Sequence, residues 1–158
     1  MTNNVKAIPE GWEGATPYLS IKGAAAAIEF YKKAFGATET MRMTGPDGRI
    51  GHAELMIGKA HIMVADEHPE IGFRSPQTLG GSPVTIHLYV EDVDALAARA
   101  EAAGAKVRRP VADQFYGDRG GQFEDPFGHV WYFATHKEDV SHEEMQKRAA
   151  AYTVGGKT

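Results

Sequence analysis

The sequence predicts an α+β protein made of two tandem βαβββ modules, followed by a C-terminal helix. The first observation is an internal repeat: residues 16–37 and 85–105 each run from a strand-like segment through a helix-like segment to a Gly-Ala pair. The second is that a strand and a hairpin pattern follow each repeat. The third is that apolar residues alternate with polar ones along most of the strand-like segments.

The first module begins with an alternating strand at 16–21, where Pro17 is tolerated near the start. Residues 23–35 are rich in alanine and place Ile28, Tyr31 and Phe35 at helical spacing, and Gly36 suits the position after a helix. Further strands are expected at 38–44, 51–57 and 60–65, with turns at 46–48 and 58–59. Residues 66–83 contain three prolines and three glycines and are predicted to form a long loop.

The second module repeats this order. A strand is expected at 84–90, and either Asp92 or Asp94 caps a helix over 92–103 that Gly104 ends. The later elements are a strand at 106–110, an aromatic loop at 113–118 and strands at 120–124 and 130–134. Ser141 and Glu144 have the spacing of a capping box, which opens a final helix to about residue 151.

These elements divide the chain into a lead-in (1–14), a first module (15–66), a linker loop (67–83), a second module (84–136) and a C-terminal helix and tail (137–158). We expect them to form one structural domain overall, because 158 residues suit one compact domain or two small modules that share a core.

Composition excludes several functional classes. The net charge of -4 gives no electrostatic support to a nucleic-acid role. The absence of cysteine excludes disulfides, thiolate metal ligands and a cysteine nucleophile. The first 14 residues lack the apolar core of a signal peptide, and no apolar run approaches the roughly 20 residues that span a bilayer. We therefore expect a cytoplasmic protein with no membrane partner.

Residues 118–136, DRGGQFEDPFGHVWYFATH, form the most distinctive stretch. Asp125-Pro126-Phe127-Gly128 has the residue types of a turn, and the aromatic segment after it is typical of a strand. Together with the repeat upstream, this hairpin resembles the last hairpin of the vicinal oxygen chelate superfamily (glyoxalase I, extradiol dioxygenases and bleomycin-binding proteins), in its PhnB-like branch. The resemblance covers about residues 15–136. It implies a cupped eight-stranded mixed sheet with helices on the convex face, a ligand cavity on the concave face, and a homodimer.

Strand alternation predicts which side chains face away from the helices. Leu19, Ile21, Leu55, Val64 and Trp131 belong to the apolar sets that must pack on a helix. The opposite sets are aromatic and polar rather than strongly charged, which is typical of small-molecule pockets. We predict a ligand site lined by Tyr18, His87, Tyr89 and Tyr132, with Phe115 and Tyr116 as a lid.

Simpler interpretations remain open for these residues. The tyrosines at 18, 89 and 132 suit half-buried packing positions equally well. His52 and His61 also suit the surface of a strand, and Glu54 also suits an ion pair with an exposed basic residue. His87 lies between apolar neighbours in a strand expected to be central, so it is the histidine that best fits the pocket.

The resemblance also implies where a metal would bind. Metal-dependent members take His, Glu or Gln ligands from four strands, and these positions align with Thr16, Met63, Thr85 and Tyr132 here. Hydroxyl, thioether and phenol groups are poor ligands for the divalent metals that such enzymes use. We therefore expect no cofactor and no metal at this site. A displaced divalent site on His52, Glu54, His61 and His87 is the alternative.

Three functions follow as hypotheses. The first is a metal-free small-molecule-binding protein. The second is an enzyme, a lyase, isomerase or dioxygenase, that uses the displaced metal site; a metal-free proton transfer by His87 or Glu54 is a variant of it. The third is a structural or regulatory dimer whose cavity has no ligand. The sequence shows no nucleophile elbow and no phosphate-binding loop.

Overall fold

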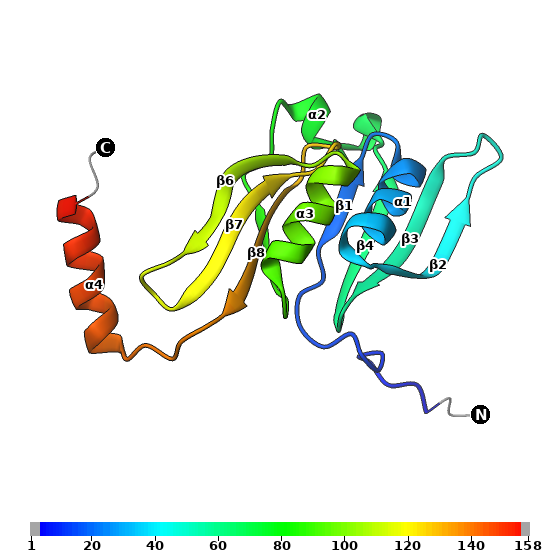
Figure 1. Cartoon of the computed structure of the whole chain (residues 1–158). Helices are drawn as coiled ribbons and strands as arrows, with labels where there is room; N and C mark the ends of the chain where they lie inside the picture. The colour runs from blue at the N-terminus through cyan, green and yellow to red at the C-terminus, as the bar shows by residue number, and fades with distance from the viewer. Residues whose placement is uncertain (1–3, 156–158) are drawn as a thin grey trace. The chain divides into compact units, whose positions relative to one another are not determined.

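A computed structural model describes residues 4–155 (Figure 1). The chain divides into two compact units, Met1–Leu79 and Gly80–Thr158. Each unit contains one four-stranded mixed sheet and a helix that packs on it. Within the described residues, no helix combines the length and apolarity that crossing a bilayer requires.

The first unit runs β1 (Tyr18–Ile21), α1 (Ala24–Phe35), β2 (Thr38–Thr44), β3 (Ile50–Ile57) and β4 (Ala60–Asp66). Its strand order is β1-β4-β3-β2, with β1 parallel to β4 and the other pairs antiparallel.

The second unit repeats the topology with β5 (Thr85–Tyr89), α3 (Val93–Ala103), β6 (Lys106–Asp113), β7 (Asp118–Glu124) and β8 (Val130–His136), in the order β5-β8-β7-β6. β5 is parallel to β8, and the other pairs are antiparallel. The helix α4 (His142–Gly155) follows. The predicted pair of βαβββ modules with a C-terminal helix is confirmed.

The segment 66–83 is more ordered than the predicted long loop. β4 extends to Asp66, and a 3-10 helix (Pro69–Ile71) and a short helix α2 (Pro76–Leu79) follow. The buried carboxylate of Glu67 organises the segment: its Oε2 accepts a hydrogen bond from the Ser75 amide at 2.9 Å and from the Thr78 hydroxyl at 2.7 Å. Glycine and proline content alone did not reveal this acceptor.

Strand boundaries also differ from the prediction. β1 begins at Tyr18, two residues later than expected, while β6 continues through Pro110 to Asp113. β7 begins at Asp118, so only residues 114–117 remain of the predicted aromatic loop. β6 is an edge strand of its sheet, where a proline that cannot donate a hydrogen bond is tolerated.

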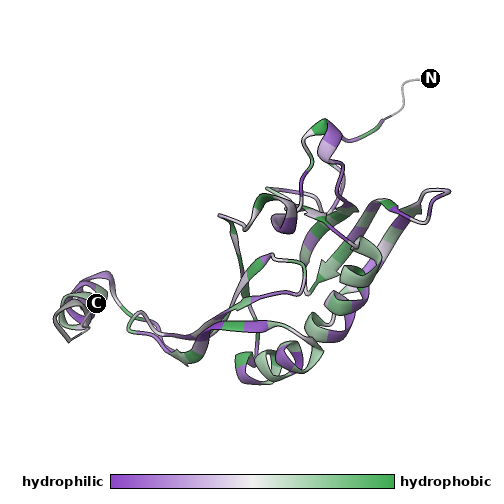
Figure 2. Cartoon of the chain, turned by 90° about the horizontal axis from the view of Figure 1, so that it is seen from above, coloured by the Kyte–Doolittle hydropathy of each residue, from purple (hydrophilic) through white to green (hydrophobic). Residues whose placement is uncertain are grey.

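Alternation along the strands builds the core of each unit, and Figure 2 shows hydrophobic and hydrophilic bands alternating along them. α1 buries Ile28 and Tyr31 on the first sheet, where the predicted apolar residues Ile21, Leu55 and Val64 are fully buried. In the second unit α3 packs on β6, β7 and β8, and Trp131 is fully buried.

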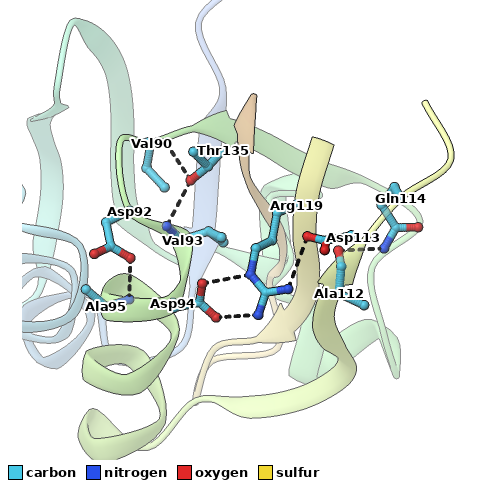
Figure 3. Close-up of polar contacts among 10 residues, drawn as sticks. All are labelled: Val90, Asp92, Val93, Asp94, Ala95, Ala112, Asp113, Gln114, Arg119 and Thr135. Atoms are coloured by element: carbon cyan, nitrogen blue, oxygen red, sulfur yellow. Dashed lines mark hydrogen bonds and ion pairs between the residues drawn. The ribbon is translucent and has the colours of Figure 1, made fainter. Parts of the chain in front are cut away.

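At the start of α1 and of α3, main-chain amides donate to a side chain from the last strand of the same module. The Asp66 carboxylate accepts the amides of Gly23, Ala24 and Ile50 at 3.1, 2.9 and 2.7 Å. The Thr135 hydroxyl accepts the Val93 amide at 2.9 Å and donates to the Val90 carbonyl (Figure 3).

Of the two predicted caps of α3, Asp92 is the N-cap and accepts the Ala95 amide at 2.9 Å. Asp94 instead forms an ion pair with Arg119, which ties α3 to β7 (Figure 3). At α4, the Ser141 hydroxyl accepts the Glu144 amide at 3.2 Å, while the Glu144 carboxylate pairs with Arg148, so half of the predicted capping box forms.

Candidate functional site

Strand register places equivalent side chains in one row across each sheet, on the face opposite the helix. In the second module the row is His87, Tyr132, Gln122 and Arg109. In the first module the row is Tyr18, Met63, Glu54 and Met41. The two rows correspond residue by residue, which supports the duplication. The second row is richer in hydrogen-bond donors.

Five of the six predicted ligand residues lie together in the second module. The ring centroid of His87 lies 4.9 Å from the ring centroid of Tyr89 and 5.0 Å from that of Tyr132. The hydroxyls of Tyr116 and Tyr132 are 3.0 Å apart, and the Phe115 and Tyr116 rings meet edge to face at 5.2 Å.

The expectation that His87 lies in a central strand is wrong for its own sheet. Within the described part of the chain, β5 pairs with β8 alone and is an edge strand. His87 is accordingly exposed, and Tyr89 is 62% exposed.

A polar network adjoins this aromatic cluster. The carboxylate of Asp118 is 4% exposed and accepts the Tyr89 hydroxyl at 2.7 Å. It also lies 2.7 Å from Nδ1 of His136, whose Nε2 is 2.9 Å from Asp139. Hydrogen bonds to Asp118, and then to Asp139, raise the pKa of His136. The hydrogen bond to Asp118 likewise raises the pKa of Tyr89, so this phenol stays protonated.

A pocket of about 240 Å³ lies within the second unit. Its polar lining comes from Arg109, Gln114, Tyr116, Tyr132 and Tyr152. Phe115, Pro110, Gly120 and Gly121 complete it. The Tyr152 ring of α4 lies 5.6 Å from the ring of Phe115, so the pocket draws on β6, β7, β8, the 114–117 loop and α4.

Two glycines in β7 make the pocket possible. A Cβ atom on Gly120 would lie 2.7 Å from the Tyr132 ring and 2.8 Å from the Phe133 carbonyl. A Cβ atom on Gly121 would lie 2.9 Å from the Arg109 carbonyl and 3.0 Å from the Val111 nitrogen. The Tyr132 ring and the β6 backbone can therefore approach β7 only because these positions lack side chains.

The first module carries a smaller polar group. The Tyr18 hydroxyl is 2.7 Å from Nδ1 of His52, whose Nε2 is 3.3 Å from Glu54. His61 stacks on Trp12 at 4.3 Å, and its buried Nδ1 has no hydrogen-bond partner among the described residues. Tyr18, the sixth predicted ligand residue, thus contacts His52 within its own module.

The residues predicted to stand at the metal positions of the metal-dependent members do not fit a divalent metal. Met63 and Tyr132 occupy equivalent places, opposite Tyr18 and His87, and offer a thioether and a phenol. Thr16 and Thr85 offer neutral hydroxyls. Among residues 4–155, no three His, Asp or Glu side chains come close enough to hold a metal ion, a finding that covers His52, Glu54, His61 and His87.

Sequence reasoning missed Arg109, Gln114 and Tyr152 in the pocket, and the buried Asp118 beside it. The pair Gly120-Gly121 was the one available signal, because glycine in the interior of a strand often marks a place where a ligand or another backbone approaches closely. The sequence did not predict Arg109 as a pocket residue, because the face of the sheet on which its side chain lies depends on the irregular pairing of β6 with β7.

Comparisons with known proteins agree with the fold. The family model of the Glyoxalase/Bleomycin resistance protein/Dioxygenase superfamily matches residues 18–133. An uncharacterised protein of Mycobacterium bovis is 47% identical over 134 residues, which cover 83% of this chain and 88% of that protein.

Two solved structures share the architecture. TioX from Micromonospora sp. ML1 aligns with a TM-score of 0.62 and 25% identity, covering 82% of this chain and all of the other. The PhnB protein from Bacillus cereus aligns with a TM-score of 0.60 over 78% of this chain and 99% of its own. Its identity is 16%, so this second likeness shows the fold alone.

Proposed function

The chain belongs to the glyoxalase/bleomycin resistance protein/dioxygenase superfamily, and we propose that it is a small-molecule-binding protein of this fold without the divalent metal site of the metal-dependent members. The proposal rests chiefly on the tyrosine-lined pocket of the second module, where Phe115, Tyr116 and Tyr132 meet. Aromatic walls with a few convergent polar groups are what small-molecule sites use.

The ligand that we propose is small and partly aromatic or amphipathic. At about 240 Å³ the pocket lies below the roughly 300–1,000 Å³ of drug-sized sites. His87 and Tyr89 extend the aromatic surface beyond Tyr132 on the same face of the sheet. Tyr18→Ala tests the predicted role of Tyr18 in ligand binding. Weaker binding supports that role, and unchanged binding contradicts it.

Thermal shift against a panel of small aromatic metabolites tests this proposal. A compound that binds only the native protein raises its melting temperature. The increase should be lost in Tyr116→Ala and retained in Met43→Ala, a change at a first-module side chain that is 60% exposed. A complete panel without any stabilising compound would argue against a binding function.

Metal titration separates this function from the enzyme that the sequence left as an alternative. Calorimetry of chelator-stripped protein with Ni, Zn, Fe(II) and Mn should show no stoichiometric site tighter than roughly micromolar, about 8 kcal/mol of binding free energy. The reason is chemical, because threonine, methionine and tyrosine cannot replace imidazoles and carboxylates. A tight site that His87→Ala or Glu54→Ala removes would establish the displaced metal site and favour the enzyme instead.

We also propose that the protein is a homodimer in which α4 contacts the partner chain. None of the α4 side chains described, residues 142–152, is buried. Met145, Ala149 and Tyr152 nevertheless form an apolar stripe at helical spacing, and Tyr152 is 66% exposed. Light scattering should give twice the monomer mass at micromolar concentration, and a truncation before Ser141 should give the monomer. A monomer mass for the full chain contradicts the proposal.

A further inference from the structure

The ionisable side chains that line the pocket are basic or phenolic. Arg109, Tyr116, Tyr132 and Tyr152 are the ionisable residues in its described lining, which contains no aspartate or glutamate. Gln114 adds an amide, which donates to the Ala112 carbonyl at 3.1 Å (Figure 3). A lining of this kind favours a ligand that accepts hydrogen bonds and carries negative charge.

Arg109 differs from its neighbours in having no acidic partner. Its guanidinium forms no hydrogen bond or ion pair with the described residues, although it acts electrostatically on Tyr116. Three other arginines of the second unit are paired with carboxylates: Arg108 with Glu124, Arg119 with Asp94, and Arg148 with Glu138. The positive charge at the pocket is therefore left for another anion.

The backbone of β6 explains why Arg109 lies at the pocket. The pairing of β6 with β7 shifts register between Val107 and Arg109, and again between Arg109 and Ala112. Such irregularities turn a side chain away from its regular direction. Gly121 permits this course, because its missing Cβ leaves room for the Arg109 carbonyl and the Val111 nitrogen.

The tyrosine pair supplies a second donor. Burial, together with the hydrogen bond to Tyr132, raises the pKa of Tyr116, so this phenol stays neutral. The two hydroxyls lie 3.0 Å apart, and one of them donates its hydrogen to the other. The hydroxyl that accepts this bond can still donate its own hydrogen to a ligand. The nearby carboxylate of Asp118 is engaged by the Tyr89 hydroxyl and lies 2.7 Å from Nδ1 of His136, while the Tyr116 hydroxyl pairs with Tyr132.

From these observations, and on the basis of the proposed binding function, we infer that the pocket selects a planar aromatic carboxylate of one or two rings. The carboxylate binds the Arg109 guanidinium and the phenol donor of the Tyr116–Tyr132 pair. The aromatic part lies against Phe115 and Tyr152. A guanidinium matches a carboxylate in planar geometry, and the ionised acceptor strengthens each hydrogen bond.

The test compares 2-naphthoate with 2-naphthamide, which has nearly the same shape but no charge. Calorimetry on the full chain should show the carboxylate binding at least about 10-fold more tightly than the amide. Arg109→Gln should abolish this preference. Arg108→Gln changes the net charge of the protein by the same amount, but Arg108 is paired with Glu124, so this variant should keep the preference.

The possible results separate the inference from the proposed function. Equal affinity for the two probes, or equal losses in Arg109→Gln and Arg108→Gln, overturns the anion selectivity and leaves the binding function standing. The same holds if neither probe binds while other members of the panel do. If no compound of the metabolite panel stabilises the protein either, both the inference and the proposed function are wrong. Circular dichroism confirms that each variant is folded before its affinity is interpreted.

Discussion

Asp125→Ala is expected to destabilise the second module by about 3 kcal/mol or more, which is a large share of the roughly 5–15 kcal/mol that a domain has. The Asp125 carboxylate is 3% exposed. Its Oδ1 accepts the amides of Phe127 and His129 at 2.9 and 3.0 Å, and its Oδ2 accepts the indole N–H of Trp131 at 2.9 Å. Alanine leaves these donors without that acceptor, and a buried unpaired donor costs about 1–3 kcal/mol.

Urea unfolding followed by tryptophan fluorescence measures this effect. Trp131 lies in the second unit and Trp12 in the first, so a Trp12→Phe background isolates the Trp131 signal. Asp125→Asn is the matched variant, because its oxygen still accepts main-chain amides while its NH₂ group faces the indole N–H. It should lose less stability than Asp125→Ala. The difference between the two variants should change when Trp131→Phe removes the indole donor; unfolding of these variants is followed by circular dichroism, because Trp131 is also the fluorescent reporter. A loss below about 1 kcal/mol in Asp125→Ala would contradict the role assigned to this carboxylate.

Asp66→Ala is expected to have a comparable effect on the first module. The N-cap residue of α1 is Gly23, which has φ 93° and no side chain to cap the helix, and no acidic residue lies in the first turn. The Asp66 carboxylate, 9% exposed, supplies the acceptor for Gly23 and Ala24 and also binds the Ile50 amide of β3. We expect a loss of about 3 kcal/mol or more, because three main-chain donors lose their acceptor together.

Asp92→Ala is the control for this experiment. Asp92 also caps a helix, but it is exposed, and Thr135 accepts a neighbouring amide of the same first turn. Its loss should cost about 1 kcal/mol, the usual effect of removing an N-cap. Amide hydrogen exchange should show faster exchange at Ala24 and Ile50 in Asp66→Ala. Equal losses in the two variants would mean that Asp66 is only an ordinary cap.

The sequence predicted the two modules because its signals were local. Gly36 and Gly104 end helices where expected, and Asp125-Pro126-Phe127-Gly128 forms the predicted turn, with the Gly128 amide 3.1 Å from the Asp125 carbonyl. Alternation also identified the buried face of each sheet, since the apolar sets at Leu55 and Trp131 are the ones that helices cover.

Contacts between distant residues were beyond such reasoning. Asp66 meets residues 42 and 43 positions earlier in the chain, and nothing in its neighbourhood distinguishes it from a polar strand end. The same holds for the candidate site. Tyr116 and Tyr132 were predicted from alternation and loop composition, whereas Arg109 required knowledge of the irregular pairing of β6 with β7.

Amide and side-chain NMR of the full chain, titrated with the most stabilising compound of the aromatic panel, tests the central claim most directly. If the second-module pocket is the binding site, the shifts should concentrate at Arg109, the 114–116 loop, Gly120, Gly121 and Tyr132. His52 and Glu54 of the first module should shift less. Saturable shifts confined to the first-module residues, with the second-module pocket unchanged, would contradict the assignment of function to this pocket.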